Sequence, residues 1–160
     1  MRSDKFTRGR LLTALLASAL TVSAVPPAPS QAAATAGTCR VEVEYVDAYD
    51  VDENNGDEIR INLAGYMYPG GGRYVAMNDG DRAYSGNFAN PATTIGTNGS
   101  ALFSLREVTP PAVGQGKELG SVTARGSTCA GLATGQTTVI PQHIFGSDYW
   151  YYMSLVMTGL

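Results

Sequence analysis

The stretch that decides the fold is CRVEVEYV, residues 39–46. Apolar residues at 41, 43 and 45 alternate with charged residues at 40, 42 and 44. A period of two over this length is typical of a strand with one face against a core. Residues 58–63, EIRINL, repeat the pattern, which directs Ile59, Ile61 and Leu63 inward and leaves Glu58, Arg60 and Asn62 to solvent.

Further strands are predicted along the rest of the chain, at residues 74–77, 101–108, 119–124, 137–140 and 149–157. Gly, Pro, Asn and Ser interrupt the chain between them, and these residues supply tight turns. No stretch after residue 37 keeps a helical spacing of apolar residues. Short strands at this spacing predict an all-β fold, an antiparallel β-sandwich of seven or eight strands in a single domain over residues 37–160.

Cys39 and Cys129 are the two cysteines of the chain. In an exported protein an even number of cysteines indicates disulfide bonding, so we predict one bridge between them. The alternatives are two free thiols or a metal ion bound by both cysteines. Two sulfur ligands alone make a poor zinc site.

The N-terminal segment has the pattern of a secretory signal peptide. A basic stretch, MRSDKFTRGR, precedes an apolar run over residues 11–25 and a Pro- and Ala-rich region. We place the signal at residues 1–34, with cleavage near Thr35 or Gly37, and predict a secreted, extracellular protein. The apolar run is too short for stable membrane insertion.

Removal of the signal would leave seven basic and thirteen acidic side chains, a net charge of about −6. This charge argues against nucleic acid and anionic membranes as partners.

Carboxylates are concentrated in one connection, DAYDVDENNGDE, residues 47–58. Oxygen-rich loops that contain Gly and Asn are used by hard cations such as Ca²⁺, so we predict a calcium site formed by Asp47, Asp50, Asp52 and Asp57. The spacing is not that of an EF-hand. The alternative is a solvated acidic loop that keeps the protein soluble.

Two other features bear on possible chemistry. His143 is the only histidine, and between apolar neighbours it indicates a strand-end residue with one nitrogen hydrogen-bonded rather than a catalytic base. The run Tyr149-Trp150-Tyr151-Tyr152 is compatible with a sugar-stacking platform, but the apolar residues that follow favour the core. No catalytic residues are predicted.

Residues 102–122, LFSLREVTPPAVGQGKELGSV, resemble the strand–loop–strand unit of synaptotagmin-type calcium- and lipid-binding β-sandwiches. Residues 56–65, GDEIRINLAG, are similar to a segment of small secreted actinobacterial proteins. The first resemblance implies a sandwich fold. In that family a loop supplies metal-binding aspartates, whereas residues 107–111 here, EVTPP, contain none.

The function predicted from these features is a secreted non-enzymatic binding module, with a calcium-stabilised acidic loop, for an extracellular protein or glycan. The first alternative is a proteinaceous protease inhibitor that presents the loop 108–117, where two prolines would lower the entropy cost of binding. The second is a small secreted hydrolase of unrecognised type. Two carboxylates suffice for glycoside hydrolysis, but among thirteen acidic residues such a pair is not a specific signal.

Overall fold

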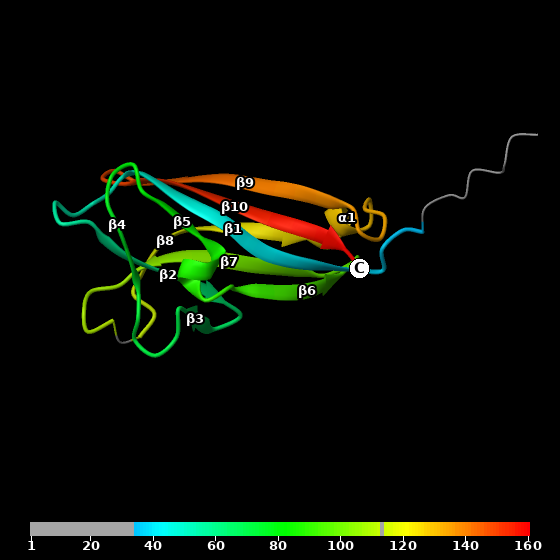
Figure 1. The fold of residues 1–160 in the computed structure, drawn as a ribbon, viewed down its shortest axis with the longest axis horizontal. Helices are drawn as coiled ribbons and strands as arrows, with labels where there is room; N and C mark the ends of the chain where they lie inside the picture. The colour runs from blue at the N-terminus through cyan, green and yellow to red at the C-terminus, as the bar shows by residue number, and fades with distance from the viewer. Residues whose placement is uncertain (1–33, 113) are drawn as a thin grey trace, which may run out of the picture. The chain divides into compact units, whose positions relative to one another are not determined.

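The computed structural model describes residues 34–112 and 114–160, which form two antiparallel sheets packed face to face (Figure 1). The first sheet contains β5 (Arg82–Tyr84), β1 (Thr38–Asp50), β10 (Trp150–Gly159) and β9 (Thr137–Phe145) in that order, with β6 (Ala92–Gly96) also paired to β1. The second contains β3 (Tyr66–Tyr68), β2 (Asp57–Leu63), β7 (Ser100–Glu107) and β8 (Lys117–Arg125), with β4 (Val75–Met77) also paired to β2. The predicted antiparallel β-sandwich is confirmed.

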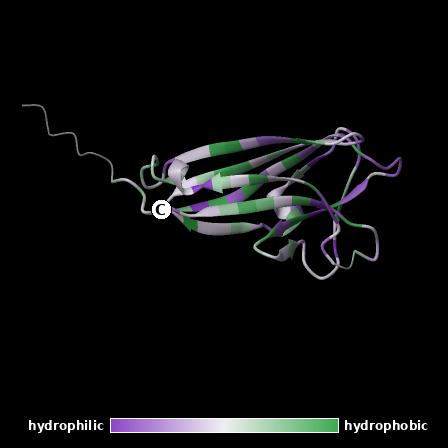
Figure 2. Ribbon diagram, turned by 180° about the vertical axis from the view of Figure 1, so that it is seen from behind, coloured by the Kyte–Doolittle hydropathy of each residue, from purple (hydrophilic) through white to green (hydrophobic). Residues whose placement is uncertain are grey.

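The core lies between the sheets and is built by strands of alternating polarity, visible as bands of colour along the ribbons in Figure 2. In β10, Tyr151, Met153, Leu155 and Met157 are fully buried. The facing strand β2 contributes Ile59, Ile61 and Leu63, as its alternation predicted.

The structure has more strands within its described residues than the seven or eight predicted. The additional ones are β3, β5 and β6, each of three to five residues. They are too short for a period of two to stand out in the sequence. Pairs of short strands add to the two halves of a longer one: β5 and β6 both pair with β1, and β3 and β4 both pair with β2. Two one-turn helices, η1 (Ser85–Phe88) and α1 (Gly126–Cys129), complete the described elements.

A β-bulge in β1 reverses which residues face the core. The register against β10 shifts between Val43 and Tyr45. Val43 is buried, as predicted, but after the bulge the buried positions become Val46 and Ala48. Tyr45 therefore lies on the outer surface of the sheet, and its predicted place in the core is wrong. An extra residue in one strand of a pair changes the parity of every residue that follows it.

Arg60 also departs from the simple alternation, because it is 4 % exposed rather than solvated. Its guanidinium donates to the carbonyl oxygen of Pro69 at 2.9 Å and to that of Ala112 at 3.1 Å. Burial lowers the pKa of Arg60. The guanidinium has five N–H donors in one plane, so a single buried arginine can donate to carbonyl groups of two separate loops.

The disulfide between Cys39 and Cys129 is confirmed, with Cα atoms 5.8 Å apart. It ties the start of β1 to α1, at the opposite end of β1 from the acidic loop (Figure 1). The predicted signal peptide, residues 1–34, lies outside the described part of the chain except for its last residue. No helix in the described part is long and apolar enough to cross a bilayer.

Candidate functional site

The acidic connection between β1 and β2 turns back sharply against the end of β4. Gly56 adopts φ +84°, and a Cβ at this position would lie 2.8 Å from the carbonyl oxygen of Met77. Only glycine fits such a close backbone approach with a positive φ. The turn therefore returns the chain directly to Asp57, the first residue of β2.

Asp57 is fully buried and accepts three hydrogen bonds. The Tyr151 hydroxyl donates to it at 2.5 Å, and the backbone N–H groups of Asp52 and Glu53 donate at 3.4 and 3.2 Å. Burial raises the pKa of Tyr151, and the hydrogen bond to Asp57 is the second cause of the increase. Donors aimed at both oxygens offset the cost of removing a carboxylate from water.

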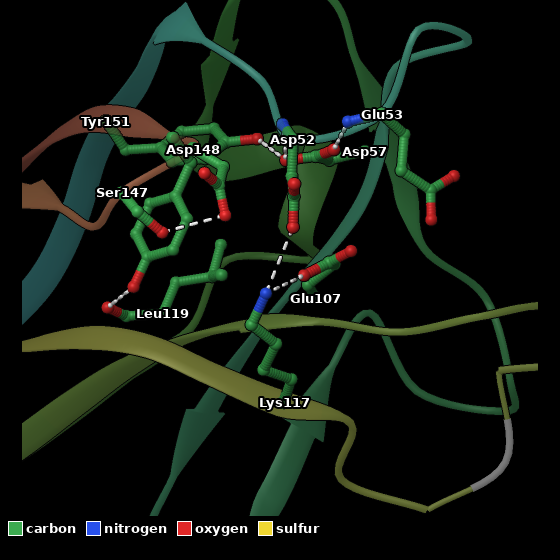
Figure 3. Close-up of polar contacts among 10 residues, drawn as sticks. Asp52, Glu53, Asp57, Glu107, Lys117, Leu119, Ser147, Asp148 and Tyr151 are labelled. Atoms are coloured by element: carbon green, nitrogen blue, oxygen red, sulfur yellow. Dashed lines mark hydrogen bonds and ion pairs between the residues drawn. The ribbon is translucent and has the colours of Figure 1, made fainter.

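Lys117, at the start of β8, lies between two further carboxylates (Figure 3). Its Nζ is 3.1 Å from an oxygen of Asp52 and 3.4 Å from an oxygen of Glu107. The hydrogen bond with Asp52 raises the pKa of Lys117, whereas burial raises the pKa of Glu107. The ammonium group of Lys117 thus supplies positive charge where the sequence predicted a metal ion.

The two remaining aspartates of the predicted calcium site lie elsewhere. Asp47 projects from the outer side of the first sheet, where Arg82 donates to its two oxygens at 2.5 and 2.7 Å. This bond raises the pKa of Arg82. Asp50 is exposed at the end of β1 and lines a cavity of about 350 Å³ together with Glu53 and Asp79.

The structure therefore does not bring Asp47, Asp50, Asp52 and Asp57 together as one ligand set. Three of them already have hydrogen-bonding or ion-pair partners within the protein. Across residues 34–112 and 114–160, no group of three or more His, Cys, Asp or Glu side chains is placed to hold a metal ion. This arrangement does not fit a calcium site, and calcium binding stays a prediction that titration can decide.

The pair Asp57 and Glu107 also invites comparison with a hydrolase, because paired carboxylates carry out glycoside hydrolysis. Asp57, however, has no exposed surface. A substrate cannot reach it in this structure. Asp57 and Glu107 belong to a polar network of β2, β7, β8 and β10 that is buried at Asp57 and reaches the surface at Lys117.

A second candidate site lies on the outer side of the first sheet. We define the aromatic face as the side chains that β1, β9 and β10 direct away from the core: Tyr45, Tyr49, His143, Phe145, Trp150 and Tyr152. Alternation places them there, since their neighbours Val46, Ala48, Ile144, Tyr151 and Met153 are buried. The bulge in β1 brings Tyr45 to this side.

Five of the six rings of the aromatic face form a continuous series of contacts. Ring centroids are 5.9 Å apart for Tyr45 and Tyr152, 5.0 Å for Tyr152 and His143, 5.9 Å for His143 and Trp150, and 4.8 Å for Trp150 and Tyr49. The indole N–H of Trp150 donates to His143 Nδ1 at 3.2 Å. Cross-strand pairs of this kind fix the rings on a rigid sheet.

Much of this surface is open to solvent. The exposed fractions are 71 % for Phe145, 48 % for Tyr49 and 46 % for Trp150. His143, Phe145 and Trp150 line a hollow of about 250 Å³. A neighbouring hollow of about 470 Å³ is lined by Pro141, Gln142, His143 and Tyr152. Contiguous exposed aromatic surface is uncommon on soluble proteins and indicates a binding surface.

Sequence reasoning assigned the run 149–152 to the core, and this is correct only in part. Tyr151 is buried, but Trp150 and Tyr152 face outward. A signal was present: with Met153, Leu155 and Met157 inward, strand parity requires residues 150 and 152 to point away. His143 matches its prediction, since one of its nitrogens is hydrogen-bonded.

Comparisons with known proteins add little beyond the fold. No model of a protein family matches the chain. No curated protein matches it either.

Among solved structures, the first C2 domain of a plant extended synaptotagmin 1 aligns with a TM-score of 0.46 and 10 % identity, over 79 % of this chain and 97 % of that domain. The paired C2 domains of extended synaptotagmin 2 align with a TM-score of 0.49 and 11 % identity, over 89 % of this chain and 48 % of theirs. Both belong to the synaptotagmin type that residues 102–122 resemble. At this level the similarity carries no information about ligands.

Proposed function

We propose that this chain is a secreted, non-enzymatic binding module that recognises neutral glycans through its aromatic face. The observation that carries this proposal is the series of partly exposed rings held on three neighbouring strands, β1, β10 and β9. Rings fixed by cross-strand contacts lose little conformational entropy when a ligand binds.

The chemistry of the aromatic face suits a sugar. Pyranose rings present apolar C–H faces that stack on aromatic rings and hydroxyl groups that need polar partners. Phe145 and Trp150 offer apolar ring surface, whereas Tyr and His side chains combine a ring with a polar tip. The two hollows both include His143, so the ring surface has two adjacent depressions in which successive sugar rings of one chain can lie.

The charges near this face favour an uncharged ligand. Arg82 lies 3.9 Å above the ring of Tyr45, but its guanidinium is bound by Asp47. Glu44 accepts a hydrogen bond from the Ser154 hydroxyl at 2.6 Å. With its nearest cation already paired, the face offers little attraction to a phosphate or carboxylate, in keeping with the acidic composition of the domain.

Direct binding measurements test this proposal. Isothermal titration calorimetry with cellohexaose, chitohexaose, xylohexaose and maltohexaose should identify at least one ligand. Replacement of Trp150 with Ala should then weaken binding about tenfold or more, because buried aromatic anchors dominate such interfaces. Tyr66→Ala is the matched control: Tyr66 is 72 % exposed on β3, in the other sheet.

The proposal fails if none of the hexasaccharides binds, or if Trp150→Ala and Tyr66→Ala behave alike. Binding of a protein partner that Trp150→Ala weakens, with no affinity for any glycan, would keep the aromatic face as the site and reject the glycan as its ligand.

A second candidate, the protease inhibitor, is favoured by the way Arg60 holds the loop after β7. Its guanidinium donates to the carbonyl oxygens of Ala112 and Gly114, while Pro110 and Pro111 stay exposed. An exposed segment fixed from beneath is the form in which inhibitors present a loop to a protease. Incubation with a panel of secreted proteases tests it, and the absence of inhibition at micromolar concentration would reject it.

A further inference from the structure

His143 occupies the centre of the aromatic face. It is the one residue that lines both hollows, and its ring contacts both Tyr152 and Trp150. Its Nδ1 accepts the hydrogen bond that the Trp150 indole donates at 3.2 Å. A ligand in either hollow would therefore touch His143 or the ring that His143 holds.

This hydrogen bond exists for only one protonation state of the imidazole. The indole Nε1–H is a donor and never an acceptor. Nδ1 can accept from it only when the imidazole is neutral with its proton on Nε2, since both nitrogens are donors in the charged form. Protonation of His143 would place an imidazole N–H donor opposite the indole N–H donor, so the hydrogen bond to Trp150 would be lost.

We propose that His143 is a positioning residue for Trp150, and that the aromatic face binds its glycan well only while His143 is neutral. The second half of this proposal rests on the proposed function. The first half, the positioning of Trp150, does not depend on it and has its own measurement.

The ionisable groups around His143 come from its own strand and from the elements packed against it. The rest of β9 contains no Asp, Glu, Lys or Arg. From β10 the facing groups are Trp150 and Tyr152, and burial raises the pKa of Tyr152, which keeps it neutral. From β1 the rings of Tyr45 and Tyr49 contact the face. The charged groups of β1 nearest to it are Asp47, which Arg82 binds, and Asp50, which lies opposite Trp150 across the strand pair.

Charges on the other neighbouring elements are, for the most part, held by partners of their own. In the hairpin between β9 and β10, Asp148 accepts from Ser147. On β8, which runs next to β9, the charged side chains are Lys117, Glu118 and Arg125, of which Lys117 binds Asp52 and Glu118 binds Arg106. Imidazole is the side chain that ordinarily changes charge between pH 5 and 8.

Two variants separate the ring of His143 from its acceptor atom. His143→Asn keeps an acceptor close to the position of Nδ1 and does not titrate. His143→Phe keeps a ring of similar size but has no acceptor. Trp150 is the only tryptophan of the chain, so its fluorescence reports the state of this contact without a label.

The first measurement uses the protein without ligand. The tryptophan emission of the wild type should change between pH 8 and pH 5 as the imidazole gains its proton, whereas His143→Asn and His143→Phe should show no transition. A wild-type emission that stays constant over this range would overturn the positioning role. A transition of equal size in His143→Asn would overturn it as well, because another group would then be its source.

The second measurement is calorimetric titration with whichever hexasaccharide the wild type binds at pH 8. Wild-type affinity should fall about three- to tenfold at pH 5, the range expected for loss of one hydrogen bond. His143→Asn should keep its affinity at both pH values, and His143→Phe should be weaker at both. If His143→Phe binds as tightly as the wild type at pH 8, the coupling to ligand binding is wrong. An emission transition without binding to any glycan would reject the proposed function and leave the positioning role standing.

Discussion

Two regions of this sandwich differ in whether their side chains are already paired within the protein. One is the aromatic face, and the other is the acidic end, which we define as residues 47–58 together with Glu107 and Lys117. The acidic end concentrates carboxylates, yet Asp57 is fully buried and Asp52 is paired with Lys117. The aromatic face resembles core in the sequence, yet Phe145 and Trp150 are open to solvent. The number of carboxylates in a segment therefore does not show that they are free to bind a ligand.

The difference follows from the cost of leaving each kind of group unpaired. A buried charge without partners is very unfavourable, so a folded chain supplies partners from its own residues. An exposed aromatic ring costs much less and can persist without an internal partner. The two regions should then respond to mutation in opposite ways: the acidic end through stability, the aromatic face through binding.

The largest expected effect tests this contrast directly. Asp57→Ala should lower the free energy of unfolding by about 3 kcal/mol, because the Tyr151 hydroxyl and two backbone N–H groups lose their buried acceptor. Trp150→Ala should lower it by less than about 1 kcal/mol, since the side chain is 46 % exposed. Urea denaturation measures both.

Asp57→Asn is the control for the shape of the side chain. It retains an acceptor oxygen in nearly the same volume and should lose less stability than Asp57→Ala. Equal losses for Asp57→Ala and Trp150→Ala would show that the two regions do not differ in the way described.

The overall fold was predictable because it depends on patterns that are local in the chain. Alternation identified β1 and β2, a continuous apolar run identified β10, and an even cysteine count in a chain with a signal-like start indicated the disulfide. These signals need no knowledge of what packs against them. The three short strands β3, β5 and β6 gave no such signal, because three to five residues do not define a period.

The site was harder to predict because it depends on partners that are distant in sequence. The bulge near Glu44 has no local signature, and it alone moves Tyr45 from the predicted core to the aromatic face. Likewise, residues 47–58 contain no basic side chain, so nothing in that stretch indicates that Lys117 and Arg82 will bind two of its aspartates. Charge compensation across the fold is decided by topology rather than by composition.

An effect of intermediate size on the free energy of unfolding is expected at alkaline pH, and it arises from Tyr151 at the acidic end. The pKa of Tyr151 is higher in the folded protein than its ordinary value of 10.0, first because of burial and then because of its bond to Asp57. For an acid whose folded pKa is raised, the stabilisation is complete below the unfolded pKa and declines as pH rises above it. Stability should therefore fall by about 1 kcal/mol between pH 10 and 11 from this residue.

Tyr151→Phe provides the comparison for this pH dependence. It should be less stable than the wild type at pH 7, because Asp57 loses a donor, but its stability should decline less steeply above pH 10. Urea denaturation at pH 7, 10 and 11 gives both quantities. Parallel pH profiles for wild type and variant would show that Tyr151 does not titrate differently in the folded and unfolded states.

The smallest expected effect is that of calcium on the acidic end. Because Asp47, Asp52 and Asp57 are bound by groups of the protein itself, an ion would have to displace Arg82 or Lys117 to collect them. Addition of 5 mM Ca²⁺ should therefore raise the melting temperature of the wild type by about 1 °C or less, which corresponds to a dissociation constant of roughly 10 mM or weaker. Mg²⁺ at the same concentration should give a similar shift.

Lys117→Met makes this prediction sharper, because it removes the internal cation while keeping an apolar chain of similar length. The variant should melt at a lower temperature than the wild type, since Asp52 and Glu107 then face each other without a positive charge between them. Calcium should restore more of its stability than it adds to the wild type. If instead millimolar Ca²⁺ stabilises the wild type by several degrees and Mg²⁺ does not, the four aspartates regroup around the ion. The calcium site predicted from the sequence would then be correct, and the acidic end would be a second ligand-binding region beside the proposed one on the aromatic face.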